Sequence, residues 1–303
     1  MNKCVVSVII PSYGTNTDPC RAIESVLSQD YSEVEVFIVD DNGEGTEQQR
    51  RNATLLKKFA EDSRVHYLVH EVNRGGSVAR NTGARASTGE YLCFLDDDDE
   101  FADRTKITKQ MKVAEELGPE WAGTYSSLKL FNGNTYLRTI LASSSGYILE
   151  EFIQDKLSIG TAAPIISRKS YDAIGGFDDS FKRHQDWEFY CRLMDRYKLK
   201  AVPDAYYHRY YKTDVKRKTA ETRLGYMDKY VAFMKQELKS LPEKRLNKLM
   251  KQKYVSVIFS FLREKQFKKA LEICKANGYT FSDYCFLFKE VIGYVIMKVS
   301  KKM

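Results

Sequence analysis

The chain has 303 residues, of which 43% are hydrophobic and 13% aromatic, which suffices for one large domain or one domain plus a small one. This composition excludes a disordered protein, and no run approaches the ~18 apolar residues that a membrane-spanning helix needs. The net charge of +7 is unevenly placed, because residues 213–303 carry 21 Lys and Arg against 9 Asp and Glu. Such a basic segment suggests contact with an anionic surface.

The N-terminal residues run directly into a strand-like segment and lack the charged, apolar and small-residue regions of a signal peptide. The six cysteines form no C-x-x-C pair, and none lies at metal-ligand spacing from a histidine. We therefore expect free thiols in a cytoplasmic protein, with a peripheral position on the inner face of the cell membrane as a second possibility.

Strand and helix patterns alternate over the first ~210 residues, which predicts an α/β domain with a mixed, mostly parallel sheet flanked by helices. The expected elements are strand 5–10, helix 21–29, strand 34–39, helix 47–61, strand 64–69, helix 77–86, strand 91–95, paired strands within 121–141, helix 186–196 and strand 206–211.

The character of the chain changes near residue 213, beyond which β-branched runs are almost absent. We expect a domain over residues 1–212 and a basic helical extension over 213–303. The extension is predicted to form helices at 216–240, 243–263, 266–276 and 281–298.

Carboxylates collect directly after two of the apolar strands, at Asp40–Asp41 and at Asp96–Asp99. Ligands of open α/β sheets bind outside the carboxyl ends of the strands, so both sets can meet in one crevice. Four adjacent aspartates repel one another unless a cation compensates them, and Mg²⁺ or Mn²⁺ prefers such oxygen ligands. The alternative is an acidic, solvated loop.

Three further positions each allow two interpretations. Arg80 follows Gly75-Gly76 on a helix, where it either meets an anion or lies on the surface. These glycines match neither a dinucleotide fingerprint nor a P-loop. Asp186 begins a helix and is either a general base or an N-cap. The pair His208-Arg209 either reaches a diphosphate or a metal, or is structural.

Taken in order, these segments resemble family 2 glycosyltransferases of the GT-A fold over roughly residues 3–212. Each motif alone is weak, but the ordered set is specific. The matching segments are Val-Ser-Val-Ile-Ile-Pro-Ser-Tyr (6–13), Val-Asp-Asp (39–41), Asn-Arg-Gly-Gly-Ser-Val-Ala-Arg-Asn-Thr-Gly (73–83), Gly-Glu-Tyr-Leu-Cys-Phe-Leu-Asp-Asp-Asp-Asp (89–99), Gly-Gly-Phe-Asp (175–178) and Gln-Asp-Trp-Glu (185–188).

The resemblance implies a role for each matching residue. Asp186 would be the general base, and Arg80 would contact the base or phosphate of a nucleotide. Asp98 would bind the metal directly, with Asp96 on the ribose or the metal and His208 a further metal candidate. The nucleotide-sugar pocket would include Pro11, Tyr13, Asp40, Asp41, Arg80, Asp96 and Asp97.

The chain departs from the family pattern in two places. The residues after Asp41 are Asn-Gly-Glu-Gly-Thr, where the family usually has a Gly-Ser-Thr-Asp-like turn. Gln185 stands where the family often has Glu, which removes a carboxylate beside the expected base.

The resemblance further implies an inverting, metal-dependent hexosyl- or N-acetylhexosaminyltransferase. It would use a nucleotide-diphospho-sugar, with UDP as the favoured carrier and Mn²⁺ or Mg²⁺ as the metal. The acceptor would be a saccharide hydroxyl, with a lipid-linked saccharide as a candidate, in cell-surface polysaccharide synthesis. Two alternatives are a nucleotidyltransferase acting on sugar phosphates and a non-catalytic protein that binds saccharide or nucleic acid.

The last predicted helix is aromatic and basic, and Lys289 and Glu290 interrupt its apolar run. Such a helix either lies at the interface of an anionic membrane or packs on protein. The basic residues are spread over four helices without a stacking motif, so no nucleic acid partner is expected.

Overall fold

The computed structural model describes residues 4–14, 19–211 and 218–289. It divides into two compact units, residues 1–215 and 216–303, three residues beyond the boundary expected from the sequence. The first unit holds every predicted site residue.

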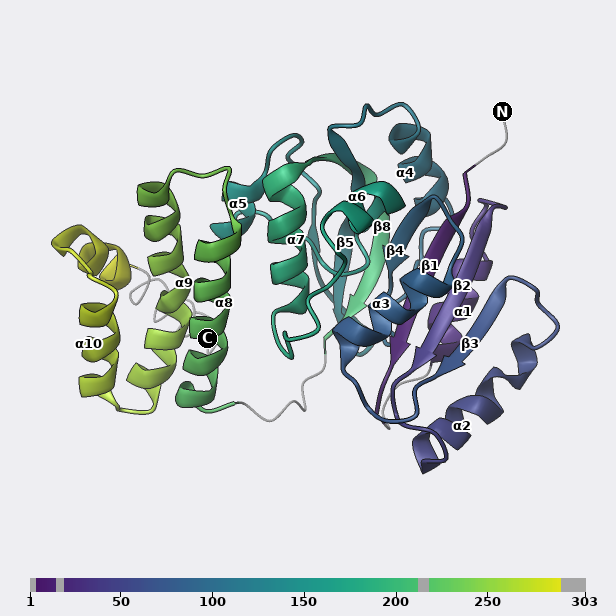
Figure 1. Cartoon of the computed structure of the whole chain (residues 1–303), viewed down its shortest axis with the longest axis horizontal. Helices are drawn as coiled ribbons and strands as arrows, with labels where there is room; N and C mark the ends of the chain where they lie inside the picture. Colours follow the sequence, from purple (N-terminus) through teal and green to yellow (C-terminus); the bar gives the residue numbers. More distant parts are fainter. Residues whose placement is uncertain (1–3, 15–18, 212–217, 290–303) are drawn as a thin grey trace. The chain divides into compact units, whose positions relative to one another are not determined.

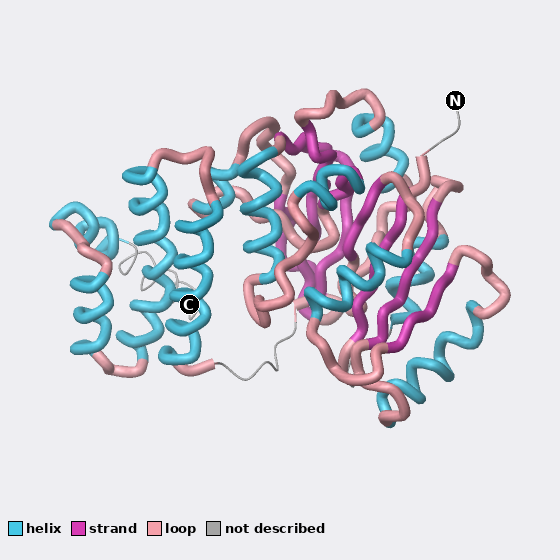
Figure 2. Tube along the Cα trace, viewed as in Figure 1, coloured by secondary structure: helices cyan, strands magenta, loops and turns pink. Residues whose placement is uncertain are grey.

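The first unit contains one eight-stranded sheet with the order β3-β2-β1-β4-β7-β5-β6, and β8 pairs with β5. Its strands are drawn in magenta in Figure 2. The pairs β1–β2, β1–β4, β2–β3 and β5–β8 are parallel, whereas β7 is antiparallel to both of its neighbours. The strands are β1 Val6–Ser12, β2 Val34–Asp40, β3 Val65–Val69, β4 Tyr91–Phe94, β5 Trp121–Asn132, β6 Thr135–Ile140, β7 Pro164–Ser167 and β8 Lys198–Tyr210.

Helices cover both faces of the parallel half of the sheet. Figure 1 shows α3 in front of the strands and α1 behind them, and both pack on β1 and β2. This arrangement explains why β1 reads as a continuous apolar run. The helices are α1 Pro19–Leu27, α2 Glu47–Leu56 with the 3₁₀ turn Lys57–Phe59, α3 Gly76–Ala86, α4 Lys106–Ala114, α5 Leu149–Ile153, α6 Arg168–Ala173 and α7 Gln185–Arg196.

Helix α3 lies unusually close to β1 because it carries Gly83 at the contact. A Cβ atom built on Gly83 would stand 2.5 Å from Cγ2 of Ile9, closer than real side chains approach. The missing side chain therefore sets the spacing between the helix and the sheet.

The order of the strands creates a switch point at β1. The chain passes from β1 through α1 to β2 on one side, and α3 later returns it to β4 on the other side. In such sheets the crevice opens at the carboxyl ends of the strands around the switch. Residues 11–13, 40–41 and 96–99 all lie at these strand ends, as the sequence predicted.

The second unit is helical in its described part. Helix α8 (Ala220–Glu237) packs on α9 (Glu243–Arg263), which packs on α10 (Phe267–Ala276), and Figure 1 shows the three side by side. Residues 281–289 are also helical, while the rest of the helix predicted at 281–298 lies outside the described residues. Within the described chain, no helix combines the length and apolar character needed to cross a membrane.

Candidate functional site

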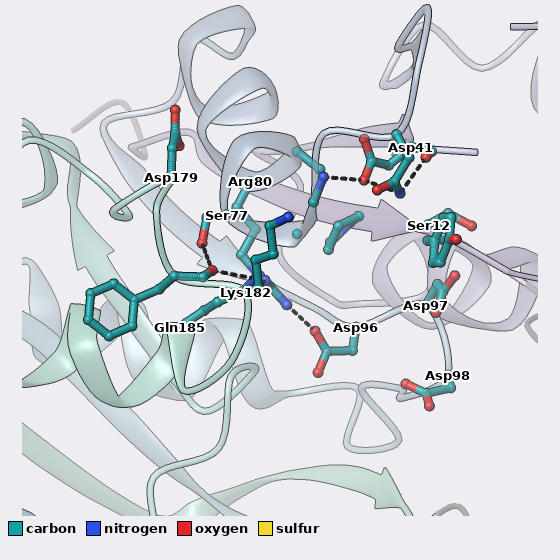
Figure 3. A pocket seen from close by; sticks show the side chains of 17 residues that line it. Ser12, Asp41, Ser77, Arg80, Asp96, Asp97, Asp98, Asp179, Lys182 and Gln185 are labelled. Atoms are coloured by element: carbon teal, nitrogen blue, oxygen red, sulfur yellow. Dashed lines mark hydrogen bonds and ion pairs between the residues drawn. The ribbon is translucent and has the colours of Figure 1, made fainter. Parts of the chain in front are cut away.

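A cavity of about 430 Å³ opens at the carboxyl ends of β1, β2 and β4 (Figure 3). The N-terminal turn of α3 forms one wall, and the loop that leads into α7 forms another. Six of the predicted nucleotide-sugar residues line this cavity: Pro11, Tyr13, Asp41, Arg80, Asp96 and Asp97. Asp98 lines it as well.

Asp41 is buried and organises the loop that precedes α3. Its Oδ1 atom lies 2.7 Å from Nδ1 of His70 and accepts the Arg74 amide at 2.8 Å. Its Oδ2 atom accepts the Asn73 side chain at 2.9 Å and the Gly75 amide at 2.7 Å. Gly75 has a φ of 93° and is the N-cap of α3, so Asp41 fixes a turn that few other residues could adopt.

Asp40 does not line the cavity, although the resemblance placed it beside the nucleoside. Its side chain is buried and accepts hydrogen bonds from Asn42, Asn52 and Tyr67 at 2.7–3.0 Å. Burial raises the pKa of the Tyr67 hydroxyl, and the hydrogen bond that this hydroxyl donates to Asp40 raises it further. In this structure Asp40 therefore ties β2 to α2 and β3.

Arg80 connects two parts of the site. Its Nη2 atom donates to Oδ1 of Asp96 at 2.6 Å, and its Nη1 atom donates to Oε1 of Gln185 at 3.0 Å (Figure 3). The guanidinium also lies 5.5 Å from the ring centre of Phe177. Arg80 therefore links the acidic segment after β4 to the first residue of α7.

Three carboxylates of the acidic segment can share one ion. Single oxygen atoms of Asp96, Asp98 and Asp99 all lie within 4.8 Å of one another. Burial, together with the charges of Asp96 and Asp98, raises the pKa of Asp99 well above its ordinary value. Three carboxylate oxygens this close together fit a hard divalent cation such as Mg²⁺ or Mn²⁺.

Asp99 was not singled out from the sequence, because a run of four aspartates does not show which side chains converge. His208 does not join this group. Its Nδ1 atom lies 3.2 Å from Oε1 of Glu100, and its ring packs against Phe131 at 4.6 Å.

Asp186 lies in the first turn of α7 and is not its N-cap, so that interpretation was wrong. The N-cap is His184, which adopts the left-handed conformation with a φ of 59° and stacks on Trp187 at 4.5 Å. Burial raises the pKa of the Asp186 carboxyl, while the charges of Arg209 and Arg80 act in the opposite direction. Asp186 does not itself line the cavity but follows Gln185, which does, and a carboxylate with a raised pKa is suited to accept a proton.

Asn81 holds the loop that forms the second wall of the cavity. Its side-chain amide donates to the Phe177 carbonyl and to Asp179, both at 2.8 Å. Its Oδ1 atom accepts the Phe177 amide at 2.9 Å and the Tyr171 hydroxyl at 2.6 Å. The Gly-Gly-Phe-Asp motif is therefore a structural anchor, which explains why it accompanies the carboxylates in the sequence.

Residues 7–174 match the model of Glycosyl transferase family 2, which is more than half of the chain. The chain belongs to glycosyl transferase family 2. The resemblance drawn from the sequence motifs is thereby confirmed.

Curated relatives support the same assignment. The chain is 25% identical over 216 residues to the amylovoran biosynthesis glycosyltransferase AmsB of Erwinia amylovora, covering 69% of this chain and 71% of the relative. It is 28% identical over 199 residues to the putative colanic acid biosynthesis glycosyl transferase WcaA of Escherichia coli K12, covering 65% and 68%.

Solved structures establish the fold of this glycosyltransferase. TarS 1-349 of S. aureus, determined with UDP-GlcNAc, superposes with a TM-score of 0.62 at 18% identity, covering 85% of this chain and 73% of that one. The mannosyltransferase PcManGT of Pyrobaculum calidifontis, determined with GDP-Man and Mn²⁺, gives 0.59 at 15% identity, covering 97% and 81%. The predicted α/β fold of the GT-A type is confirmed.

Proposed function

We propose that this glycosyltransferase moves a sugar from a nucleotide-diphospho-sugar to a saccharide hydroxyl with inversion at the anomeric carbon. The observation that carries the proposal is the linkage of Asp96 and Gln185 through Arg80, which sets the acidic segment beside the expected base. UDP is the favoured carrier, because the TarS structure contains UDP-GlcNAc. The polysaccharide pathways of AmsB and WcaA favour a cell-surface saccharide as the acceptor.

Asp98, Asp96 and Asp99 would hold a divalent metal, Mn²⁺ or Mg²⁺, through one oxygen each. A bound metal supplies charge stabilisation for the diphosphate that leaves. Arg80 keeps Asp96 oriented for this purpose through its 2.6 Å hydrogen bond. Lys182, which also lines the cavity, adds a second positive charge near the donor.

Asp186 would accept the proton of the acceptor hydroxyl. The hydroxyl oxygen attacks the anomeric carbon, the bond from that carbon to the diphosphate oxygen breaks, and the nucleoside diphosphate leaves with the electron pair. A single displacement inverts the anomeric centre without a carboxylate nucleophile. The raised pKa of Asp186 brings its basicity closer to that needed near neutral pH.

The nucleoside would lie against Pro11 and Tyr13 at the mouth of the cavity. The Tyr13 side chain is 63% exposed although it is aromatic, so it offers a ring face for a base. Asp41 would act mainly by shaping the Asn73–Gly75 turn beneath the nucleoside, because four hydrogen bonds already occupy its oxygens.

A thermal-shift assay with UDP, GDP and dTDP, each with and without Mn²⁺, tests the donor site. We expect one nucleotide to raise the melting temperature in a metal-dependent manner, and Asp98→Asn to abolish the metal dependence. If no nucleotide stabilises the wild-type protein with metal present, the donor proposal fails.

A second experiment tests the base. Asp186→Asn should lose transfer by at least ~10³-fold while donor affinity stays within about threefold of the wild type, because the amide cannot accept the proton. A parallel loss of donor affinity and rate would instead assign Asp186 to donor binding.

The second unit is proposed to bring the enzyme to an anionic membrane that carries a lipid-linked acceptor. Phe281 and Phe288, on the helical segment 281–289, are 84% and 65% exposed, and Lys289 follows them. Exposed aromatic side chains beside basic residues suit a membrane interface. More protein should sediment with vesicles of phosphatidylglycerol than with vesicles of phosphatidylcholine, and Phe281→Ser should reduce the amount that sediments with phosphatidylglycerol. Equal sedimentation with both lipids, unchanged in Phe281→Ser, would count against this role.

A further inference from the structure

One guanidinium beside the site has no part in the mechanism above. Arg209 lies near the end of β8, in a segment that runs along the acidic loop. His208 and Glu100 exchange both backbone hydrogen bonds, at 3.1 and 2.8 Å, and the Tyr210 amide donates to Oδ1 of Asp99 at 2.9 Å. The backbone on each side of Arg209 is thus fixed against the segment that holds the metal ligands.

The direction of the Arg209 side chain follows from its neighbours. Oε1 of Glu100 accepts the Tyr210 hydroxyl at 2.6 Å and lies 3.2 Å from Nδ1 of His208. His208 and Tyr210 therefore point to the same face of the strand, and Arg209 points to the opposite face. The side chains of His208 and Arg209 therefore point to opposite faces of β8.

Arg209 lies within the electrostatic range of the site carboxylates. Its charge lowers the pKa of Asp186, against the dominant effect of burial, and acts in the same direction on Asp99. Among the residues that the structure describes, however, no hydrogen bond or ion pair holds its guanidinium, and Arg209 as a residue is exposed. Arg80, by contrast, is paired directly with Asp96.

A guanidinium that only compensated these acids would be expected to pair with one of them, as Arg80 does. Five N–H donors that remain available beside a metal site and a general base instead suit an anionic ligand, and the planar fork matches the oxygens of a phosphate. Arg209 does not line the donor cavity, but the Tyr210 amide next to it binds Asp99, which places Arg209 beside the acidic segment.

We propose that Arg209 binds a phosphate group of a substrate next to Asp186. The phosphate has two sources, the diphosphate of the donor and a phosphate carried by the acceptor. This inference rests on the proposed function, because it assumes that a nucleoside diphosphate binds with metal in the neighbouring cavity.

Titration calorimetry on Arg209→Gln tests the proposal, with UDP, uridine and inorganic phosphate as probes at fixed Mn²⁺. If wild-type protein binds another nucleoside diphosphate instead, that diphosphate and its nucleoside replace UDP and uridine. Arg138→Gln is the matched control, because Arg138 is an exposed arginine on β6 that does not line the cavity. Failure of the wild type to bind any nucleoside diphosphate would refute the proposed function. The role of Arg209 is tested separately, by comparing the affinities of Arg209→Gln with those of the wild type and of Arg138→Gln.

If the donor supplies the phosphate, Arg209→Gln should weaken UDP binding about 10- to 100-fold and leave uridine binding unchanged, as expected for a charged hydrogen bond. If the acceptor supplies it, UDP affinity should stay the same while inorganic phosphate no longer binds the UDP-saturated enzyme. Arg209→Lys should restore part of the affinity in either case. Wild-type affinities for all three probes in Arg209→Gln would overturn the proposal.

Discussion

Asp41 accepts four hydrogen bonds in the site, and replacing it with Asn removes its negative charge and one of its two acceptor oxygens. The wild-type carboxylate accepts two hydrogen bonds on each oxygen, and every partner is a donor: His70, Asn73 and the amides of Arg74 and Gly75. The amide group of Asn offers one oxygen and one NH₂. Whichever way it is oriented, the NH₂ faces two donors and both of those bonds are lost.

The size of the effect follows from these contacts. A hydrogen bond to a charged group contributes about 1.5–3 kcal/mol, so two lost bonds correspond to about 3–6 kcal/mol. His70 can relieve one of the two conflicts by moving its proton to Nε2, which would then donate to Thr82 at 3.0 Å. We therefore expect Asp41→Asn to lower the free energy of unfolding by about 2–4 kcal/mol.

Urea denaturation followed by circular dichroism measures this loss, and amide hydrogen exchange at Arg74 and Gly75 shows whether it is local. Asp62→Asn is the control, because Asp62 also accepts several hydrogen bonds but from the partly exposed Arg64, and we expect a loss below about 1 kcal/mol. Stability within about 0.5 kcal/mol of the wild type and unchanged exchange in Asp41→Asn would refute the reasoning.

Three further predictions concern packing, charge and pH. Gly83→Ala should lower the free energy of unfolding by about 1–3 kcal/mol because its Cβ would overlap a β1 side chain, whereas Gly225→Ala, with nothing within 4 Å, should raise it by roughly 0.5–1 kcal/mol; equal shifts in urea midpoint would contradict this. Arg192→Met should cost about 3–5 kcal/mol by stranding the buried Glu188 carboxylate, and adding Glu188→Gln should recover part of it in a double-mutant cycle. Turnover should fall as the pH drops through the raised pKa of Asp186, because protonation removes the base; a flat profile between pH 5 and 8, measured with saturating donor, would argue against this role.

The sequence predicted the parallel half of the sheet well because those strands are buried on both faces. β1, β2 and β4 read as continuous apolar runs, and each ends within two residues of its predicted end. The antiparallel strand β7 was not predicted, because its four residues carry no periodicity. β8 begins at Lys198 and not at 206, because its first residues are charged and partly exposed.

The sequence predicted most of the residues that lie at the candidate site, but not the contacts that these residues make. Strand ends and motif order brought Pro11, Asp41, Arg80 and Asp98 to one cavity. They could not show that Asp40 is enclosed by its own chain, since a buried and a ligand-binding aspartate look alike in a sequence. His70 was also missed, because its pairing with Asp41 joins two separate strand ends.

Helix α3 holds the proposed base and the acidic segment in place before any substrate binds. Four of its residues make separate attachments within about two turns: Ser77 to the Phe181 carbonyl, Arg80 to Asp96 and Gln185, Asn81 to the 177–179 loop, and Gly83 to β1. The helix therefore fixes the start of α7 and the segment after β4 to the same rigid element. Because a misplacement of about 1 Å can cost 10²-fold in rate, such a shared support holds the two halves of the site at a constant separation.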